Sequence, residues 1–164
     1  MSAAPAGRYY DALEIRDPAT REREQFARLP DHIRHAKAHA PYFARRLADV
    51  DPDEVRDRAQ LAKLPVTRKS DLVELQKADL PLGGLAAVAS AQLARIYQSP
   101  GPTYDPEGTG RDWWRTARAL FAAGFRPGDI VHNTFAYHFT PAGKTAQPSA
   151  CAPDSNIAPA GVKW

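Results

Sequence analysis

Three histidines have the residue type and the spacing that could hold a metal ion. His32, His35 and His39 occupy positions i, i+3 and i+7, so a helix would present their imidazoles on one side. A stable site needs more ligands, and no cysteine or carboxylate completes a ligand set here. We therefore interpret these histidines as a solvated helix face and expect no metal site.

Adjacent tryptophans and a short acidic run are the other groups that could act on a ligand. Trp113 and Trp114 could stack on a base, but in such a pair we expect one indole to pack inside and the other to be partly exposed. Asp53, Glu54 and Asp57 lack a partner arrangement for acid–base catalysis. We expect a solvated surface at these carboxylates.

The charge balance gives little reason to expect a nucleic-acid partner. The 22 basic residues exceed the 19 acidic ones by a net charge of only +3. Arg21 and Arg23 alternate with Glu22 and Glu24, as on an ordinary mixed surface. Nucleic-acid binding is therefore not expected, and it remains a third hypothesis whose mark would be a strong salt dependence.

Membrane and secretory signals are not found in the sequence. No run of about 18 apolar residues could form a transmembrane helix. The first residues lack the apolar stretch of a secretory signal. Cys151 is the single cysteine, so no internal disulfide can form. We expect a cytoplasmic protein that does not bind a membrane.

A long helix is expected to position the histidines. Apolar side chains recur at helical spacing over residues 17–40, which predicts a helix that Asp17 caps and Pro41 ends. Pro30 lies inside this pattern and predicts a kink or a restart at Asp31.

Shorter helices are expected to follow. Tyr42, Phe43 and Leu47 are expected to begin a short second helix, and a helical turn opens at Asp51. Thr67 is predicted to cap a helix that begins at Arg68. The first part of the chain is therefore a helical segment.

The second part of the chain predicts strands around a helix. Residues 94–99 are typical of a strand, 100–110 of a loop rich in proline and glycine, and 111–123 of a helix. A second strand is expected at 130–133. The order strand, helix, strand predicts an incomplete βαβ unit with a parallel sheet, and hence an α/β fold.

The composition changes sharply near residue 143. Residues 144–164 show no hydrophobic period, carry few charges and repeat Ala, Pro and Ser. Such a segment has too little apolar surface to order itself. We expect residues 1–143 to form one incomplete domain and residues 144–164 to be a disordered tail.

Three short segments carry a resemblance to a known family. Residues 39–46, HAPYFARR, resemble the segment VPFYR, and residues 64–72, LPVTRKSDL, are similar to the block LPFTTKDDL. Residues 124–131, GFRPGDIV, resemble a helix-to-strand turn. All three are features of phenylacetate-CoA ligases, which belong to the AMP-dependent synthetase and ligase (adenylate-forming) family, and their order agrees over roughly residues 10 to 143.

The resemblance implies the N-terminal part of an acyl-CoA ligase. Full-length members use ATP, Mg and coenzyme A to activate a carboxylic acid and to form its thioester. It also implies a phosphate-binding loop at residues 99–106, where this chain reads SPGPTYDP and the family reads SSGTTGKP. Ser99, Gly101 and Thr103 match the family pattern and are the candidate cofactor-binding residues.

The other residues of this loop work against the binding of phosphates. Pro100 and Pro102 have no N–H to donate, and Tyr104 replaces a flexible glycine. Asp105 replaces a lysine, and a carboxylate about 4 Å from a phosphate charge costs ~1 kcal/mol in water and ~4 kcal/mol at a dielectric of about 20. We expect no cofactor for this chain alone and assign no catalytic residue.

Two main hypotheses of function follow. The leading one is a truncated, inactive relative of phenylacetate-CoA ligase, because the family's ribose-binding aspartate, adenine-contacting motif and catalytic lysine lie beyond the length of this chain. The alternative is a non-catalytic interaction module that pairs with another protein chain, or with a missing ligase domain, through its unfinished sheet. Residues 137–139, Tyr-His-Phe, are expected to serve packing.

Overall fold

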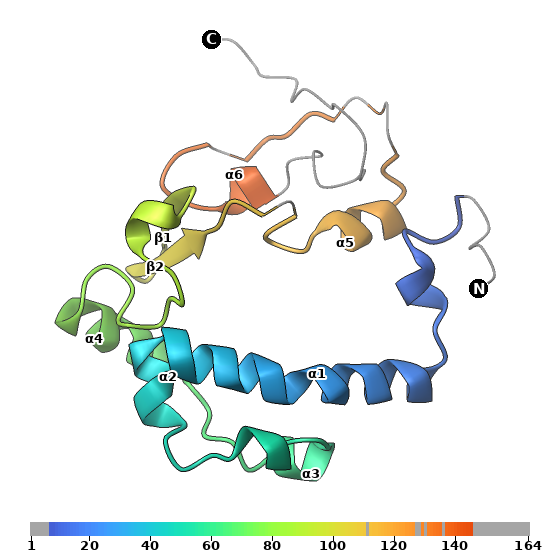
Figure 1. The fold of residues 1–164 in the computed structure, drawn as a ribbon. Coiled ribbons are helices and arrows are strands. Elements are labelled where there is room, and N and C mark those ends of the chain that lie inside the picture. Colours follow the sequence, from blue (N-terminus) through green and yellow to red (C-terminus); the bar gives the residue numbers. More distant parts are fainter. Residues whose placement is uncertain (1–6, 111, 127–128, 130, 136, 146–164) are drawn as a thin grey trace.

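The computed structural model describes residues 7–110, 112–126, 129, 131–135 and 137–145. α1 runs along one side of the molecule with α2 and α3 next to it, and the strands lie on the other side with α5 and α6 (Figure 1). In chain order the elements are η1 (Ala12–Ile15), α1 (Pro18–His39), α2 (Pro41–Arg46), η2 (Pro52–Glu54), α3 (Arg58–Leu61), α4 (Lys69–Ala78), η3 (Ser90–Gln92), β1 (Arg95–Ser99), β2 (Thr103–Glu107), α5 (Ala117–Ala122) and α6 (Ala142–Thr145). Among the described residues, no helix has both the length and the apolar character to cross a membrane.

The long first helix is confirmed. The Asp17 side chain accepts a hydrogen bond from the Thr20 N–H at 2.9 Å, which satisfies one free donor of the first turn. Of the kink or restart predicted at Asp31, the restart is wrong, because α1 continues through Pro30 and Asp31 without a break. Pro30 and Ile33 are both buried and lie one turn apart, so their packing holds the helix together across the missing hydrogen bond.

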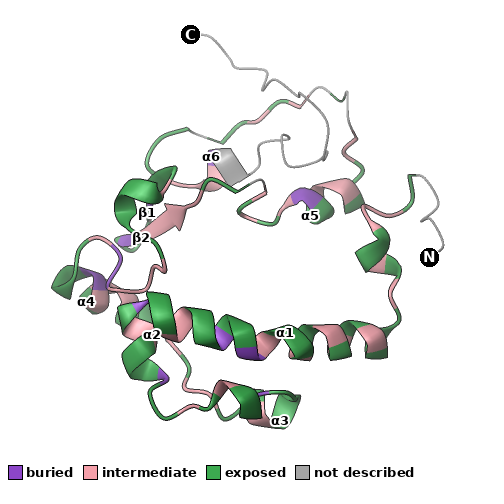
Figure 2. Ribbon diagram, viewed as in Figure 1, coloured by how far each residue is buried: buried purple, intermediate pink, exposed green. Residues whose placement is uncertain are grey.

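The hydrophobic core is small and lies between α1, α2 and the chain that follows α2. Ile33, Leu47 and Val55 form its buried centre. Figure 2 shows that buried segments are short and separated along the ribbon. Half-buried apolar side chains surround the centre: Leu29, Phe43, Val50 and Leu64.

The predicted cap of α4 is wrong by one residue. The helix begins at Lys69, with Arg68 in the cap position and no side-chain cap bond. The Thr67 hydroxyl lies instead 3.2 Å from the hydroxyl of Tyr42, so it joins α2 to the segment before α4. Thr67 therefore makes a tertiary hydrogen bond with Tyr42 in place of the predicted cap bond to the first turn of α4.

The two strands form an antiparallel hairpin and not a βαβ unit. The strand expected at 94–99 is confirmed as β1, but residues 103–107 of the expected loop form β2, which pairs with β1. The error arose because prolines and glycines occur all along residues 100–110, whereas only those at 100–102 form the tight turn and Pro106 lies within β2. Residues 131–133 are not a strand, and residue 130 lies outside the described residues.

The helix expected at 111–123 is shorter than predicted. α5 spans only Ala117–Ala122, and residues 112–114 form a turn. Asp112 and Arg115 have φ angles of 48° and 55°, which no regular α-helix tolerates. Asp112 Oδ1 accepts from the N–H groups of Thr116 and Ala117 at 2.9 and 3.1 Å, so this residue anchors the true helix start.

The N-terminal segment packs on α5. Arg118 forms an ion pair with Asp11 at 2.5 Å, and the rings of Tyr10 and Phe121 meet edge to face at 5.8 Å. This contact joins the N-terminal segment to α5, and Figure 1 shows the two next to each other. Most of the segment at 144–164, predicted to be disordered, lies outside the described residues.

Candidate functional site

The candidate phosphate-binding residues lie in the turn of the β1–β2 hairpin. Ser99 and Thr103 pair directly across the two strands, and residues 100–102 connect them. Gly101 has a φ angle of +110°, a conformation that glycine adopts without strain. No atom lies within 4 Å of where its Cβ would be, so the turn projects into open space. The structure therefore brings all three residues together.

The polar side chains of this turn are already engaged or covered. The Ser99 hydroxyl donates a hydrogen bond to the Asp105 carboxylate. Thr103 is only 2% exposed. Of the three matching residues, only Gly101 is fully exposed, and it offers main chain alone. The exposed tip thus holds no free hydroxyl from Ser99 or Thr103 and lies next to a carboxylate.

The outer edge of β2 is closed by a buried glutamine from α4. Gln76 is 4% exposed, and its amide bonds twice to Tyr104. Its Oε1 accepts from the Tyr104 N–H at 2.8 Å, and its Nε2 donates to the Tyr104 carbonyl at 2.9 Å. The Gln76 amide therefore pairs with the main chain of Tyr104 as a neighbouring strand would, and it fixes the position of β2 relative to α4.

An indole completes this edge. Pro106 has no N–H, and its carbonyl accepts from Trp113 Nε1 at 3.0 Å. The Trp113 ring lies so close to Gly108 that a Cβ there would be 2.4 Å from it. All outward main-chain groups of Tyr104 and Pro106 are thus satisfied by side chains.

Tyr97 anchors the opposite strand. The side chain is 5% exposed, and its hydroxyl donates to Glu107 Oε2 at 2.9 Å. Arg95 also reaches Glu107, at 3.1 Å. Burial, and then the hydrogen bond to Glu107, raise the pKa of the Tyr97 phenol to about 12. The phenol is a structural donor at neutral pH and not an acid–base group.

An apolar hollow of about 650 Å³ lies beside the turn. Ser99 and Pro100 form one wall, and Leu120 of α5, Phe135 and Pro141 contribute apolar surface to it. The Gln98 N–H of β1 donates to the Phe139 carbonyl at 2.8 Å, which ties this later segment to the sheet. The hollow could accept an apolar group next to Ser99.

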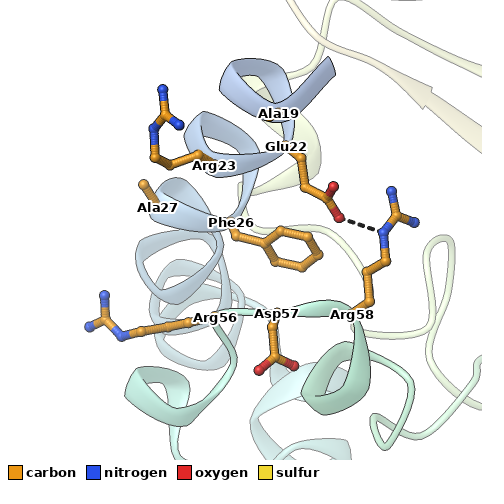
Figure 3. A pocket seen from close by; sticks show the side chains of 8 residues that line it. All are labelled: Ala19, Glu22, Arg23, Phe26, Ala27, Arg56, Asp57 and Arg58. Carbon is orange, nitrogen blue, oxygen red and sulfur yellow. Dashed lines mark hydrogen bonds and ion pairs between the residues drawn. The ribbon is translucent and has the colours of Figure 1, made fainter. Parts of the chain in front are cut away.

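A second hollow, of about 460 Å³, lies between α1 and the residues that precede α3 (Figure 3). Phe26 points into it, and Arg58 Nε bonds to Glu22 Oε1 at 2.5 Å across its opening. Asp57 caps α3, and Arg56 bonds to a neighbouring carboxylate. The Arg58–Glu22 ion pair therefore joins α1 to α3 across this hollow.

The other candidates from the sequence are spread over the surface. No group of three metal-ligating side chains occurs among the residues that the structure describes, which include all three helical histidines. Trp113 is 45% exposed and Trp114 is half-buried, as expected for the pair. The packing role expected for residues 137–139 is wrong, because Tyr137 and Phe139 are 52% and 77% exposed.

Sequence reasoning missed Gln76 and Trp113 as the residues that position the turn. A signal for Gln76 was present, since it lies one turn after Leu72 on the inner side of the predicted helix. A polar residue on an apolar stripe must find a partner when it is buried. No comparable signal marked Trp113.

Comparison with known proteins relates this chain to acid–CoA ligases. No protein-family model matches the chain. A phenylacetate-coenzyme A ligase of Aromatoleum evansii is 35% identical over 122 residues, which cover 69% of this chain and 27% of that protein. Enzymes with the same name from Escherichia coli and Pseudomonas putida are 34% and 31% identical over 122 and 136 residues. The chain spans 27% and 30% of their lengths.

Solved structures show the same relationship. A crystal structure of 2-hydroxyisobutyryl-CoA ligase in the postadenylation state, in complex with 2-HIB-AMP, matches 91% of this chain with a TM-score of 0.77 and 28% identity. The same ligase with 2-HIB-AMP and CoA, in the thioesterification state, gives 0.75 and 27%. This chain covers 33% and 34% of those two proteins. The matches show that the chain belongs to the phenylacetate-coenzyme A ligase-like acid–CoA ligases, of whose length it spans about a third or less.

Proposed function

We propose that this chain is a non-catalytic relative of AMP-forming phenylacetate-CoA ligases. Its relatives are named as ligases that join an acid to coenzyme A, but the chain spans only about a third of their length or less. On the family resemblance at residues 99–106, we assign the β1–β2 turn to the phosphate-binding loop. The hydrogen bond from Ser99 to Asp105 in this turn is the observation that carries the proposal.

The turn does not fit a nucleotide triphosphate. A phosphate cradle needs main-chain N–H groups and hydroxyls that point outward, with positive charge nearby. Here the Ser99 hydroxyl is held by Asp105, Thr103 is covered, and two prolines leave the turn short of donors. The carboxylate would also repel the phosphates. No residue of this chain is therefore assigned to hold ATP, Mg or coenzyme A.

Activity assays test the proposal directly. Purified chain is mixed with phenylacetate, ATP, Mg²⁺ and coenzyme A, and acid-dependent pyrophosphate exchange and thioester formation are measured. Neither product is expected above the background without protein. Turnover by the purified chain would overturn the proposal.

A charge reversal tests the role of the carboxylate. Asp105→Lys removes the repulsion and frees the Ser99 hydroxyl, so the affinity for ATP measured by calorimetry should rise. The control is Glu74→Gln, which removes an exposed carboxylate of α4 that bonds only to Lys77. Equal ATP affinities for the original chain and the Asp105→Lys variant would show that Asp105 does not limit binding.

An interaction module is the second candidate, and exposed apolar surface favours it. Ile96 of β1 is 38% exposed, and the buried Nε1 of Trp114 has no hydrogen-bond partner among the described residues. Gln76 and Trp113 close the β2 edge, and the Gln98 N–H of β1 already donates to Phe139. A partner chain would therefore pair with the β1 edge at Ile96. Sedimentation velocity should then show self-association or a complex, and Ile96→Lys should weaken it. A compact monomer at all concentrations would contradict this candidate.

A further inference from the structure

His35 and His39 lie together near the end of α1, apart from the hairpin and its hollow. Their ring centroids are 4.5 Å apart and the rings are tilted by 46°. Both side chains are exposed. Four residues correspond to about 6 Å of helix rise, so the two rings cover adjacent turns of one face. The third histidine, His32, lies one turn before His35 on the same helix, and the ring contact is between His35 and His39.

We propose that His35 and His39 form a two-point binding site for a late divalent transition-metal ion such as Ni²⁺, Cu²⁺ or Zn²⁺. Imidazole nitrogen is a preferred ligand for these ions. Two histidines one turn apart on a helix are the spacing that many zinc enzymes use for two of their ligands. Water fills the remaining coordination positions, so the bound ion stays open to exchange.

The charges around this pair permit a bound cation. Arg34 is held by Asp31 and Asp53, and the Lys37 ammonium donates to the carbonyls of Ala48 and Val50. Both cations are therefore engaged by partners of their own. His39 is also the last residue of α1, where the helix dipole favours positive charge.

Calorimetric titration of the full chain with NiCl₂ tests the site. His35→Ala leaves only His32 and His39, which are seven residues apart. The affinity for Ni²⁺ should therefore fall at least about tenfold, since loss of even a residue that supports a metal ligand lowers metal affinity about 10–100-fold. His32→Ala is the matched control, because it removes one exposed imidazole from the same helix and leaves the pair intact. Its affinity should equal that of the original chain.

Thermal unfolding gives a second measurement that does not depend on the heat of binding. NiCl₂ should raise the Tm of the original chain and of His32→Ala, because an ion that bridges one turn binds only the folded helix. The shift should be lost in His35→Ala and in His39→Ala. Equal shifts in all variants, or no binding by the original chain, would overturn the proposal. Circular dichroism without metal confirms that each variant keeps its helix.

Discussion

The helical region and the hairpin are stabilised by different kinds of contact. Between α1, α2 and η2, apolar side chains pack around Ile33 and Val55, and ion pairs lie on the exposed surface. In the hairpin, the amide of Gln76 and the indole of Trp113 bond directly to the main chain of β2. The first region depends on buried area, and the second depends on the geometry of a few polar atoms.

This difference predicts how each region responds to substitution. Apolar burial has no direction, so a conservative change in the helical core loses only the volume that is removed. A hydrogen bond to a buried main-chain group is specific, and the group left without its partner carries the cost. The helical core should therefore tolerate swaps of similar shape, and the hairpin should not.

Ile33→Ala should have the largest effect. The residue is 4% exposed at the centre of the core, and truncation leaves a cavity. Its free energy of unfolding should fall by about 2–4 kcal/mol, measured by urea denaturation, whereas Ile33→Val should cost only about 1 kcal/mol. If the two variants lose equal stability, the core does not behave as a packed apolar centre.

Gln76→Leu should come next. The shape is nearly kept, but the N–H and carbonyl of Tyr104 lose their partners, which costs about 2 kcal/mol. Hydrogen exchange at the Tyr104 amide should accelerate, while exchange in α1 stays unchanged. The exposed Gln98→Leu is the control for loss of an amide. Slow exchange at Tyr104 in the Gln76 variant would remove the distinction between the regions.

Tyr97→Phe should have a smaller effect at neutral pH, of about 1 kcal/mol, through the lost hydrogen bond to Glu107. The pKa of this phenol is raised to about 12, so its contribution is complete below its ordinary pKa of about 10 and is lost as pH rises toward 12. The difference between the ultraviolet titrations of the two chains should show a midpoint near 12. A midpoint near 10 would contradict burial of Tyr97.

Asp53→Asn tests the surface ion pairs and should have the smallest effect. Hydrogen bonds from Arg34 and then Arg56 hold the pKa of the Asp53 carboxyl below its usual value. The stability that it contributes is therefore present above the unfolded pKa of about 3.9 and disappears as pH falls through the lower folded value. Unfolding midpoints of the two chains should differ slightly near neutral pH and converge in strong acid. A difference that grows in acid would have the wrong sign.

The same comparison explains how far the sequence could predict the structure. Asp17, the proline that follows it and the helical spacing of apolar residues are local signals, and α1 and its cap were predicted from them. The core residue Ile33 lay on that predicted stripe. Local sequence signals were therefore sufficient to predict where α1 begins and ends.

The hairpin was less predictable because its stabilising contacts are distant in sequence. Gln76 lies 28 residues before Tyr104, so no local pattern shows that residues 103–107 have a partner for their outer edge. The positive φ angles of Asp112 and Arg115, which shorten α5, likewise have no sequence signal. The assignment of Ser99, Gly101 and Thr103 to a phosphate-binding turn stays a prediction from the family resemblance, and no local pattern indicated that Asp105 would accept a hydrogen bond from Ser99.

The contact of the Trp113 ring with Gly108 has a consequence for sequence change over time. A Cβ at residue 108 would overlap the indole, so the glycine cannot be replaced while the tryptophan keeps its place. A larger residue at 108 becomes acceptable only together with a smaller one at 113. In a family alignment, a residue larger than glycine at 108 should therefore occur only where residue 113 is smaller than tryptophan.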